Sequence, residues 1–426
     1  MKQRYKWLIA GISTVAILTT VAGCEAKSSL GNDVAKASIS RIEISKQKQN
    51  LDSHISTVTT SVSSENNTSK SGGKIYSVTM VNSMDGWASG SVTQHAALWK
   101  TTDGGNHWIS VTLPFEAKIT TTYRLQTQIR FDPINSTTIW AAFVSKNGDQ
   151  IFVTTDGGQN WIHRTTVKTN DDMIALLQFI DSSHGWLVTN NGSGMQFATN
   201  NLHDTVNRAI SWKLISSSGK GAFSIPGLVG GNIELQNKTT GWMAGQSPIN
   251  GEALLWVTRD QGATWKRKLL AYSPMYKNAT ITVGIPTFDN HGNSEIGVMP
   301  VTFYIYRSDQ TSTLIYTTED KGKVWKPGHA LITHVPVITD FVNARYGWAT
   351  NAPWDPKRPE LLKTSDAGRK WSVISRSHEL INTTQLEFVS PQVGFAVTMN
   401  PMTGQIGLDK TTNGGSSWIH YSMVIE

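Results

Sequence analysis

The sequence predicts an all-β protein, a seven-bladed β-propeller with four-stranded antiparallel blades. Two repeated patterns, running in phase, predict this fold. The first is an eight-residue box, Thr-x-Asp-x-Gly-x-x-Trp, which begins at residues 101, 154, 258, 318, 364 and 411. The second is an apolar stretch that ends in Gly-Trp or a variant of it. A repeat of about 50 residues indicates one supersecondary unit per copy, and units of four short strands suit propeller blades.

The second pattern gives the number of units. It occurs at Gly86-Trp87, Gly185-Trp186, Gly241-Trp242, Gly347-Trp348 and Gly394-Phe395, with weaker forms at Ile139-Trp140 and Gly297-Val298. These are seven units against six boxes, so one box is degenerate. We expect the box of the third unit to begin at Thr199-Asn-Asn201 and to end at Trp212, after an insertion through Asn207 and Arg208.

The first unit shows why each repeat is expected to form four strands. Strands are predicted over residues 75–81, 87–90, 97–101 and 108–112, where β-branched, aromatic and other apolar residues are frequent. Residues 82–86 form a turn cluster, and Asp103-Gly-Gly105 forms another. Pro114 ends the fourth strand because proline cannot donate to a strand ladder.

The box residues are expected to be structural. Glycine permits the positive φ of a tight hairpin, the Asp or Asn side chain accepts backbone N–H groups, and the tryptophan packs between adjacent blades. One carboxylate per turn falls short of the about six to eight oxygens of a calcium site, so no metal is expected. This structural role is assigned to Asp103, Asp156, Asp260, Asp320, Asp366 and Asn413.

The N-terminal residues 1–23 are predicted to be a signal peptide. Lys2, Arg4 and Lys6 precede an apolar stretch that is too short to span a bilayer comfortably. Val21-Ala-Gly-Cys24 then resembles the bacterial lipoprotein cleavage box. Cys24, the one cysteine of the chain, is expected to carry acyl chains that anchor the protein at the outer face of the bacterial cytoplasmic membrane. The alternative is an ordinary secretory signal with an incidental cysteine.

Residues 24–73 are predicted to be a lipid-anchored flexible tether, because they are rich in Ser, Thr, Asn and Lys. Within them, residues 39–45 alternate like a strand and could pair with the last blade to close the ring. Residues 418–425, however, are expected to complete the seventh blade by themselves. The propeller is predicted to occupy residues 74–426.

The paired repeats resemble the Asp-box (BNR) repeats of sialidase-like propellers. The combination of an apolar stretch ending in Gly-Trp-Ala with Leu-x-x-Thr-x-Asp-Gly-Gly-x-x-Trp is most similar to the photosystem II stability/assembly factor family, over residues 74–426. The resemblance implies a propeller and, by analogy, a protein partner bound through a charged surface patch. That patch has no residue-by-residue match in this sequence, and a fold alone does not establish a function.

No catalytic residues and no cofactor are expected. Sialidases carry an Arg-Ile-Pro element, whereas this chain has Ser224-Ile-Pro226. Xyloglucan-type glycosidases with similar boxes use two facing propellers, and one is predicted here. The sequence also lacks a nucleophile elbow, a His-Glu-x-x-His motif and a phosphate loop, and its 11 histidines are scattered.

Charge restricts the partners only loosely. The chain has 38 basic and 31 acidic residues, a net charge of +7, which becomes +4 once Lys2, Arg4 and Lys6 are removed. Nucleic-acid binding is not expected, because no basic stripe carries stacking aromatics. The expected partners are the membrane, through acylated Cys24, and a protein or another component of the cell envelope.

Candidate binding residues are expected in loops on the face opposite the boxes, since loops carry function more often than the scaffold does. Tyr, Trp and Arg are the types enriched at recognition hot spots, and these loops supply Tyr276, Tyr306, Arg307, Trp354 and Arg358. Packing is the alternative for each, with Trp354 plugging the channel and Tyr276 lying under its own loop. The sequence favours a non-catalytic scaffold or receptor. The alternatives are a sialidase-like glycan-binding protein or glycoside hydrolase, and a sensor feeding a membrane kinase.

Overall fold

The computed structural model describes residues 74–116, 129–145, 147–169, 173–190, 200–218, 231–289, 294–306, 308–331, 335–400, 402, 404, 406–422 and 424–425. The expected signal peptide, Cys24, the tether and the strand-like residues 39–45 therefore lie outside the described residues. No helix within the described ranges is long and apolar enough to cross a bilayer.

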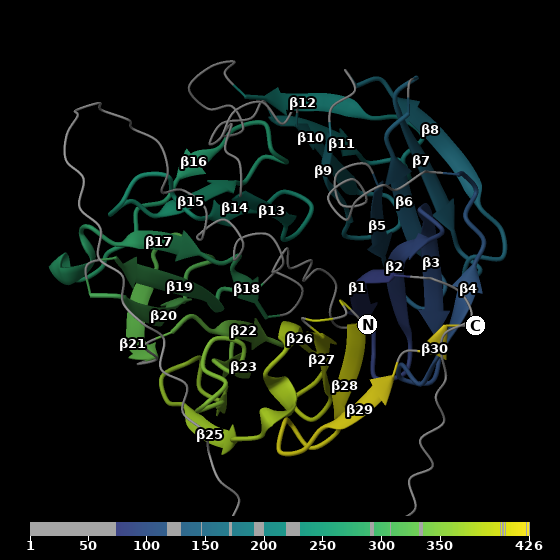
Figure 1. Cartoon of the computed structure of the whole chain (residues 1–426). Coiled ribbons are helices and arrows are strands. Elements are labelled where there is room, and N and C mark those ends of the chain that lie inside the picture. The colour runs from purple at the N-terminus through teal and green to yellow at the C-terminus, as the bar shows by residue number, and fades with distance from the viewer. Residues whose placement is uncertain are drawn as a thin grey trace, which may run out of the picture. The chain divides into compact units, whose positions relative to one another are not determined.

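The described chain confirms the seven-bladed β-propeller, whose sheets succeed one another around a ring (Figure 1). Blade 1 contains β1 (Lys74–Met80), β2 (Gly86–Val92), β3 (His95–Thr101) and β4 (His107–Val111). Blade 2 contains β5 (Ile129–Pro133), β6 (Ile139–Phe143), β7 (Asp149–Thr154) and β8 (Ile162–Val167). Blade 3 contains β9 (Met173–Phe179), β10 (Gly185–Asn190), β11 (Asn200–Thr205) and β12 (Lys213–Ser217). Blade 4 contains β13 (Gly231–Leu235), β14 (Gly241–Gly245), β15 (Leu254–Thr258) and β16 (Lys266–Arg267).

Blade 5 has an inner strand in two pieces, β17 (Thr280–Val283) and β18 (Thr287–Phe288), which both pair with β19 (Gly297–Ile305). Pro286 lies in the interruption, where its missing N–H breaks no ladder. The blade continues with β20 (Gln310–Thr318) and β21 (Lys326–Leu331). Blade 6 contains β22 (Ile338–Phe341), β23 (Gly347–Thr350), β24 (Leu361–Thr364) and β25 (Ser372–Ser375). Blade 7 contains β26 (Thr383–Phe388), β27 (Gly394–Met399), β28 (Ile406–Thr411) and β29 (Ile419–Ser422).

Each blade runs outward from the ring centre in chain order, so its first strand is innermost and its fourth outermost (Figure 1). The Gly-Trp pattern occupies the second strand in a constant register. Trp87 stands opposite Thr79 and Lys100, and the same position is held by Val298 in blade 5 and by Phe395 in blade 7. The weaker sequence variants therefore mark true blades.

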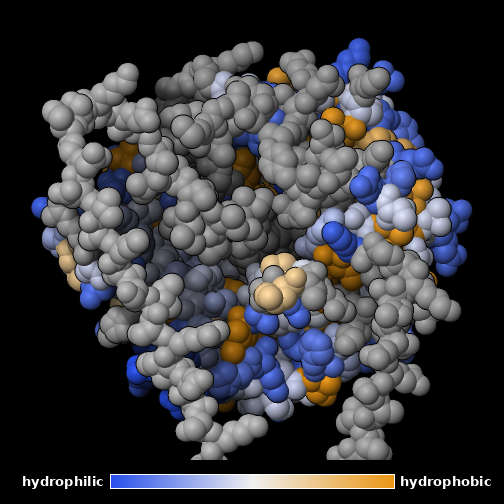
Figure 2. Space-filling model, in the orientation of Figure 1, coloured by the Kyte–Doolittle hydropathy of each residue, from blue (hydrophilic) through white to orange (hydrophobic). Residues whose placement is uncertain are grey.

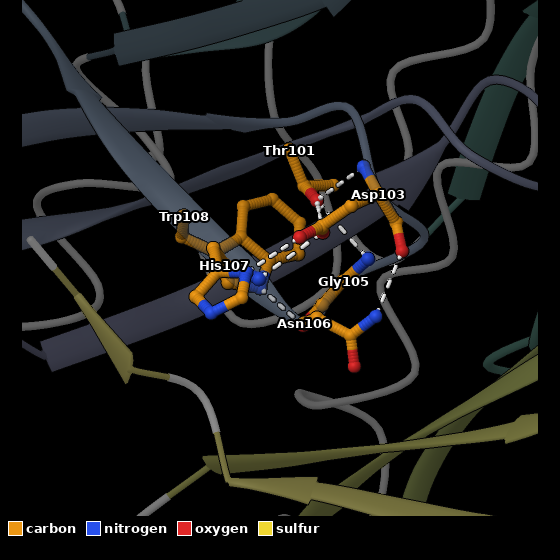
Figure 3. A network of polar contacts seen from close by, with 6 residues as sticks. All are labelled: Thr101, Asp103, Gly105, Asn106, His107 and Trp108. Atoms are coloured by element: carbon orange, nitrogen blue, oxygen red, sulfur yellow. Dashed lines mark hydrogen bonds and ion pairs between the residues drawn. The ribbon is translucent and has the colours of Figure 1, made fainter.

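The box is the turn between the third and fourth strands, and blade 1 shows its chemistry (Figure 3). Thr101 Oγ1 donates to Asp103 Oδ1 at 2.9 Å and accepts the N–H of Gly105 at 3.0 Å. Asp103 Oδ1 also accepts the N–H of His107 at 3.1 Å, and Trp108 Nε1 donates to the Gly105 carbonyl at 3.1 Å. Side chains thus satisfy the polar groups that the tight turn leaves unpaired.

The third box differs from the sequence expectation. Its eight residues are Thr205 to Trp212, with no insertion, and Thr199 to Asn201 are not part of it. Thr205 Oγ1 donates to Asn207 Oδ1 at 3.0 Å and accepts the N–H of Ala209 at 3.1 Å, as in the other boxes. The sequence did not identify this box correctly because Asn207 replaces Asp and Ala209 replaces Gly, although the hydrogen-bond pattern is unchanged.

Two consecutive positions of every box have positive φ. The fifth position also approaches the preceding blade closely: a Cβ on Gly105 would lie 2.4 Å from Leu408 Cδ2. The fourth position is more permissive, with φ between 61° and 78°, and it is held by Gly104, Gly157, Arg208, Gln261, Lys321, Ala367 and Gly414.

Polar side chains join adjacent blades near the centre and at the box end. On the inner strands, Asp132 Oδ2 accepts the N–H of Phe179 at 2.6 Å, and Asp340 Oδ2 accepts that of Phe388 at 2.7 Å. At the box end, Lys410 Nζ lies 5.5 Å above the Phe395 ring and donates to the Ser83 carbonyl at 2.9 Å. Because hydrogen bonds are directional, these contacts restrict how one blade can rotate or slide against the next.

The ring closes through the C-terminal residues. Residues 419–422 form the outer strand of blade 7, as expected, but β30 (Val424–Ile425) leaves that blade and pairs in parallel with β4 of blade 1. Gln385 of blade 7 also donates to the Val78 carbonyl on the inner strand of blade 1 at 3.1 Å. Blades 7 and 1 are therefore joined at both their inner and their outer strands.

Candidate functional site

The loops opposite the boxes build an ordered platform over blades 4 and 5. The blade-4 loop between β14 and β15 is fixed to the connection that leads into blade 5, since the Gly251 N–H donates to the Ala279 carbonyl at 2.7 Å. Tyr272 donates its hydroxyl to the Gly251 carbonyl. Gly251 has φ of 75°, and a Cβ there would lie 1.9 Å from the Lys277 carbonyl oxygen, so only glycine permits this approach.

Three large side chains are exposed on this platform. Ile249 in the blade-4 loop is 55 % exposed, Met275 in the short helix η1 (Pro274–Tyr276) is 61 % exposed, and Tyr306 beyond β19 is 82 % exposed. Their elements are adjacent, because Thr280 of β17 pairs with Tyr304 of β19. The strands β19 and β20 have nine residues each, against four to seven for the second and third strands of other blades, so their hairpin carries Tyr306 farther out.

The platform has a rigid support beneath it. Tyr276 is buried, and its ring stacks on Phe303 with centroids 4.2 Å apart. The packing alternative therefore describes Tyr276, which carries Met275 rather than presenting its own ring. At the hairpin, the Tyr306 ring stands edge-on to Tyr304, whose hydroxyl donates to Asp309 Oδ1 at 3.1 Å. Arg307, the fifth sequence candidate, lies outside the described residues.

The other two candidates lie on the adjacent blade 6, in the loop between β23 and β24. Asn351 organises this loop: its side-chain oxygen accepts the Glu360 N–H at 2.7 Å and its amide donates to the Arg358 carbonyl at 3.2 Å. Trp354 is half-buried against the blade 6–7 core, whereas Arg358 is exposed. Arg358 is thus available to a partner, and Trp354 contributes mainly packing.

The described carboxyl groups with raised pKa values lie away from this platform. Burial raises the pKa of Asp409 on β28, and the nearby charge of Glu379 adds to the rise, while His420 lies 2.7 Å away as its partner. Burial also raises the pKa of Asp204, which is on β11 of blade 3. The two acids lie on the third strands of blades 3 and 7, which are not neighbours in the ring, so they do not form the close pair of carboxyl groups, about 5–10 Å apart, of a glycosidase.

Metal ligands are not gathered in the described part of the chain, where no group of three or more His, Cys, Asp or Glu side chains could hold an ion. In the box of blade 1 the Asp103 carboxylate is instead occupied by protein donors. Burial acts to raise the pKa of Asp103, but hydrogen bonds from His107 and Thr101 outweigh burial and lower it. His107 Nδ1 lies 2.6 Å from Asp103 Oδ2.

The sequence reasoning missed Ile249, and it gave Met275 no role apart from Tyr276. Neither residue carries a motif. The available signal was Asn250-Gly251, a turn dipeptide beside an apolar residue in a long second-to-third strand loop. The exposure of Ile249 depends on the contact between Gly251 and the next blade, which sequence periodicity does not reveal.

Comparisons with known proteins identify a related fold but do not assign the chain to a family. No protein-family model matches the chain, and no curated protein matches it. Among solved structures, it is similar to YCF48 bound to a D1 peptide, with 17% identity, a TM-score of 0.51, and coverage of 81% of this chain and 95% of that one. YCF48 from Cyanidioschyzon merolae has 13% identity and a TM-score of 0.47, with 83% and 96% coverage. A GH74 xyloglucanase from Xanthomonas campestris has 12% identity and a TM-score of 0.48, with 82% and 54% coverage. The likeness to YCF48 bound to a D1 peptide shows a shared fold, so function has to be argued from the site.

Proposed function

We propose that this protein is an exported, membrane-anchored binding scaffold or receptor, without catalytic activity, whose partner is a protein or an envelope component. The observation that carries the proposal is the loop platform defined by Ile249, Met275 and Tyr306. Large apolar and aromatic side chains that stand on a buried, hydrogen-bonded support are typical of recognition surfaces, because the loop backbone that carries them is already ordered and loses little conformational entropy when a partner binds.

The surroundings of the platform support binding over chemistry. Its exposed side chains are apolar or aromatic, and Arg358 on the next blade adds a charged group able to form paired hydrogen bonds. The peptide in the complex of YCF48 with a D1 peptide is a property of that protein, and it suggests a peptide-like partner here only by analogy. Acylation at Cys24 and an extracytoplasmic location complete the proposal and rest on the sequence.

A crosslinking capture from native membranes tests the proposal. The full anchored chain is compared with a Met275→Ser, Tyr306→Ala double variant and with Ile162→Ala, a matched control at an exposed aliphatic position on β8 of blade 2. We expect a stoichiometric partner with the wild type and with the control, and a loss of at least about tenfold with the double variant, since hot-spot truncations cost about 2 kcal/mol or more.

Two results would redirect the proposal. Equal capture by all three forms would place the binding surface elsewhere on the propeller. If no form captures a protein, a glycan array comes next, because an exposed tyrosine can also stack on a sugar ring. Glycan binding that depends on Tyr306 would favour the glycan-binding alternative.

A further inference from the structure

Positive charge is distributed unevenly around the ring. Residues 259–376, which run from the box of blade 4 to just beyond the outer strand of blade 6, contain 16 Lys and Arg against 10 Asp and Glu. Residues 74–258 contain 12 of each. The basic excess of the propeller is therefore concentrated on blades 4 to 6, and the loop platform does not account for it.

Much of this excess gathers at the box end of blades 4 and 5. Arg259 donates to the Lys321 carbonyl at 2.6 Å, and Lys268 Nζ donates to the Lys323 carbonyl at 3.1 Å. These bonds bring the end of blade 4 against the box turn of blade 5. We name the resulting cluster the basic box patch and define it as Arg259, Lys266, Lys268, Lys321 and Lys323.

The cations of the patch stand close enough to influence one another. Burial lowers the pKa of Lys268, and the positive charges of Arg259 and Lys266 lower it further, against the opposing effect of Asp320. Lys321 and Lys323 are exposed. The cations of the patch therefore form one cluster at the surface.

The neighbouring carboxylates are partly engaged. Asp260 Oδ1 accepts the Thr264 N–H at 2.9 Å and Asp320 Oδ1 accepts the Val324 N–H at 2.9 Å, each inside its own box turn. Glu319 lies 3.9 Å from Arg369 of blade 6. Glu295 is exposed beside Lys321. Five cations face three carboxylates, Asp260, Asp320 and Glu295, which leaves a positive excess.

Aliphatic side chains are interspersed among these cations. Val324, between the box lysine and tryptophan, is 56 % exposed, and Ile296 is 48 % exposed. Ile296 lies beside Lys321, whose N–H donates to the Glu295 carbonyl at 3.0 Å. A soluble polyanion would pair with the lysines and leave the aliphatic groups in water. A bilayer interface accommodates both, because phosphates meet the cations and the acyl boundary takes the aliphatics.

We propose that the basic box patch docks on an anionic phospholipid surface. Docking at the box end directs the opposite end of the same blades, with Ile249, Met275 and Tyr306, away from the bilayer and toward a partner. The proposal goes beyond the binding function, since it concerns a different surface and a different ligand. The acyl anchor expected at Cys24 would hold the patch near lipid, so that even weak attraction suffices.

The test uses the full chain, inserted by its own N-terminus into vesicles of phosphatidylcholine alone or with about one third phosphatidylglycerol. Lysine acetylation is measured residue by residue with mass spectrometry. We expect Lys321 and Lys323 to be protected on the phosphatidylglycerol vesicles alone, and the protection to disappear in high salt, where screening shortens the reach of charges to about 3 Å. Lys74, at the start of β1 in blade 1, and Lys168, just beyond β8 in blade 2, are exposed away from the patch; they serve as internal controls and should react equally on both.

Variants then separate charge from aliphatic contact. The double variant Lys321→Gln, Lys323→Gln removes two cations of the patch. Its ratio of docked to undocked protein, measured from the acetylation of Lys266, should fall about 25-fold, because each lysine near an anionic leaflet contributes about a fivefold factor. Val324→Ser should reduce docking, whereas the matched control Ile162→Ser, at a position 49 % exposed on blade 2, should not. Unchanged circular dichroism in every variant establishes that the fold is intact.

Three outcomes would overturn the proposal: no protection on either vesicle, equal protection on both, or protection by soluble polyphosphate with no further protection on phosphatidylglycerol. The last would assign the patch to an anionic polymer. Partner capture through Tyr306 is measured separately, so failure of lipid docking and failure of the binding function remain distinguishable.

Discussion

Replacing Trp265 by alanine should destabilise the propeller by about 3–4 kcal/mol. The Trp265 side chain is fully buried, and its ring lies 6.1 Å from that of Trp186 of the preceding blade. A tryptophan buries about 200 Å², which at about 25 cal/mol per Å² corresponds to ~5 kcal/mol. Trp265 Nε1 has no acceptor among the described residues, so its removal also relieves about 1 kcal/mol of unsatisfied burial.

The assay is urea unfolding followed by circular dichroism and by fluorescence, because a chain of this size yields a free energy only where the two transitions coincide. Trp108→Ala is the informative comparison. Trp108 is also fully buried, but its Nε1 donates to Gly105, so its loss also leaves an acceptor unpaired and should cost about 1 kcal/mol more. A loss below about 1 kcal/mol for Trp265→Ala would refute the conclusion that box tryptophans hold adjacent blades together.

Three further changes test the box and the ring. The Asp156 carboxylate accepts hydrogen bonds from Asn160, and they lower its pKa from 3.8 to about 2. The stability that the ionised Asp156 carboxylate contributes is therefore complete above pH 3.8 and is lost as the pH falls toward 2. Asp156→Asn should make the melting temperature decline less steeply over this pH interval. An unchanged slope would exclude the Asp156 carboxylate as a source of the decline. Lys410→Met removes the bond to Ser83 across the junction of blades 7 and 1, and it should lower the free energy of unfolding in urea by about 1.5–3 kcal/mol; no loss would mean that β30 and the bond from Gln385 to Val78 close the ring without it. Gln261 is exposed and has φ of 63°, which strains a residue with a side chain. Gln261→Gly should therefore raise the free energy of unfolding by about 1 kcal/mol. A lower midpoint in urea unfolding would contradict strain at this position.

The binding surface was only partly accessible from sequence. Residue type selected Tyr306 and Arg358, and both are exposed in the structure. The same criterion selected Tyr276, which is buried, because a tyrosine in a loop looks the same in sequence whether it faces solvent or packs on Phe303. The roles of all these residues in binding remain predictions for the capture experiment.

The basic box patch shows a second reason why a surface site is not visible in the sequence alone. Its cations come from the box and outer strand of blade 4 and from the box of blade 5, and each of these segments alone contains an ordinary mixture of charges. The hydrogen bonds from Lys268 to the Lys323 carbonyl, across 55 residues, and from Arg259 to the Lys321 carbonyl, across 62 residues, show that these cations share one surface. Overall net charge could not reveal them, since residues 377–426, with one Lys against four Asp and Glu, offset half of the excess.

The sequence by itself determined the number of blades and the chemistry of their turns, because each blade is a local unit whose Gly-Trp strand and box form contacts within about 50 residues. It did not locate the third box, since Asn207 and Ala209 keep the hydrogen bonds of the motif but not its letters. The tertiary structure alone decided how β30 joins blade 1, which tyrosine is exposed, and where the cations gather. Those features depend on contacts between blades, and such contacts are set by how the sheets pack around the ring.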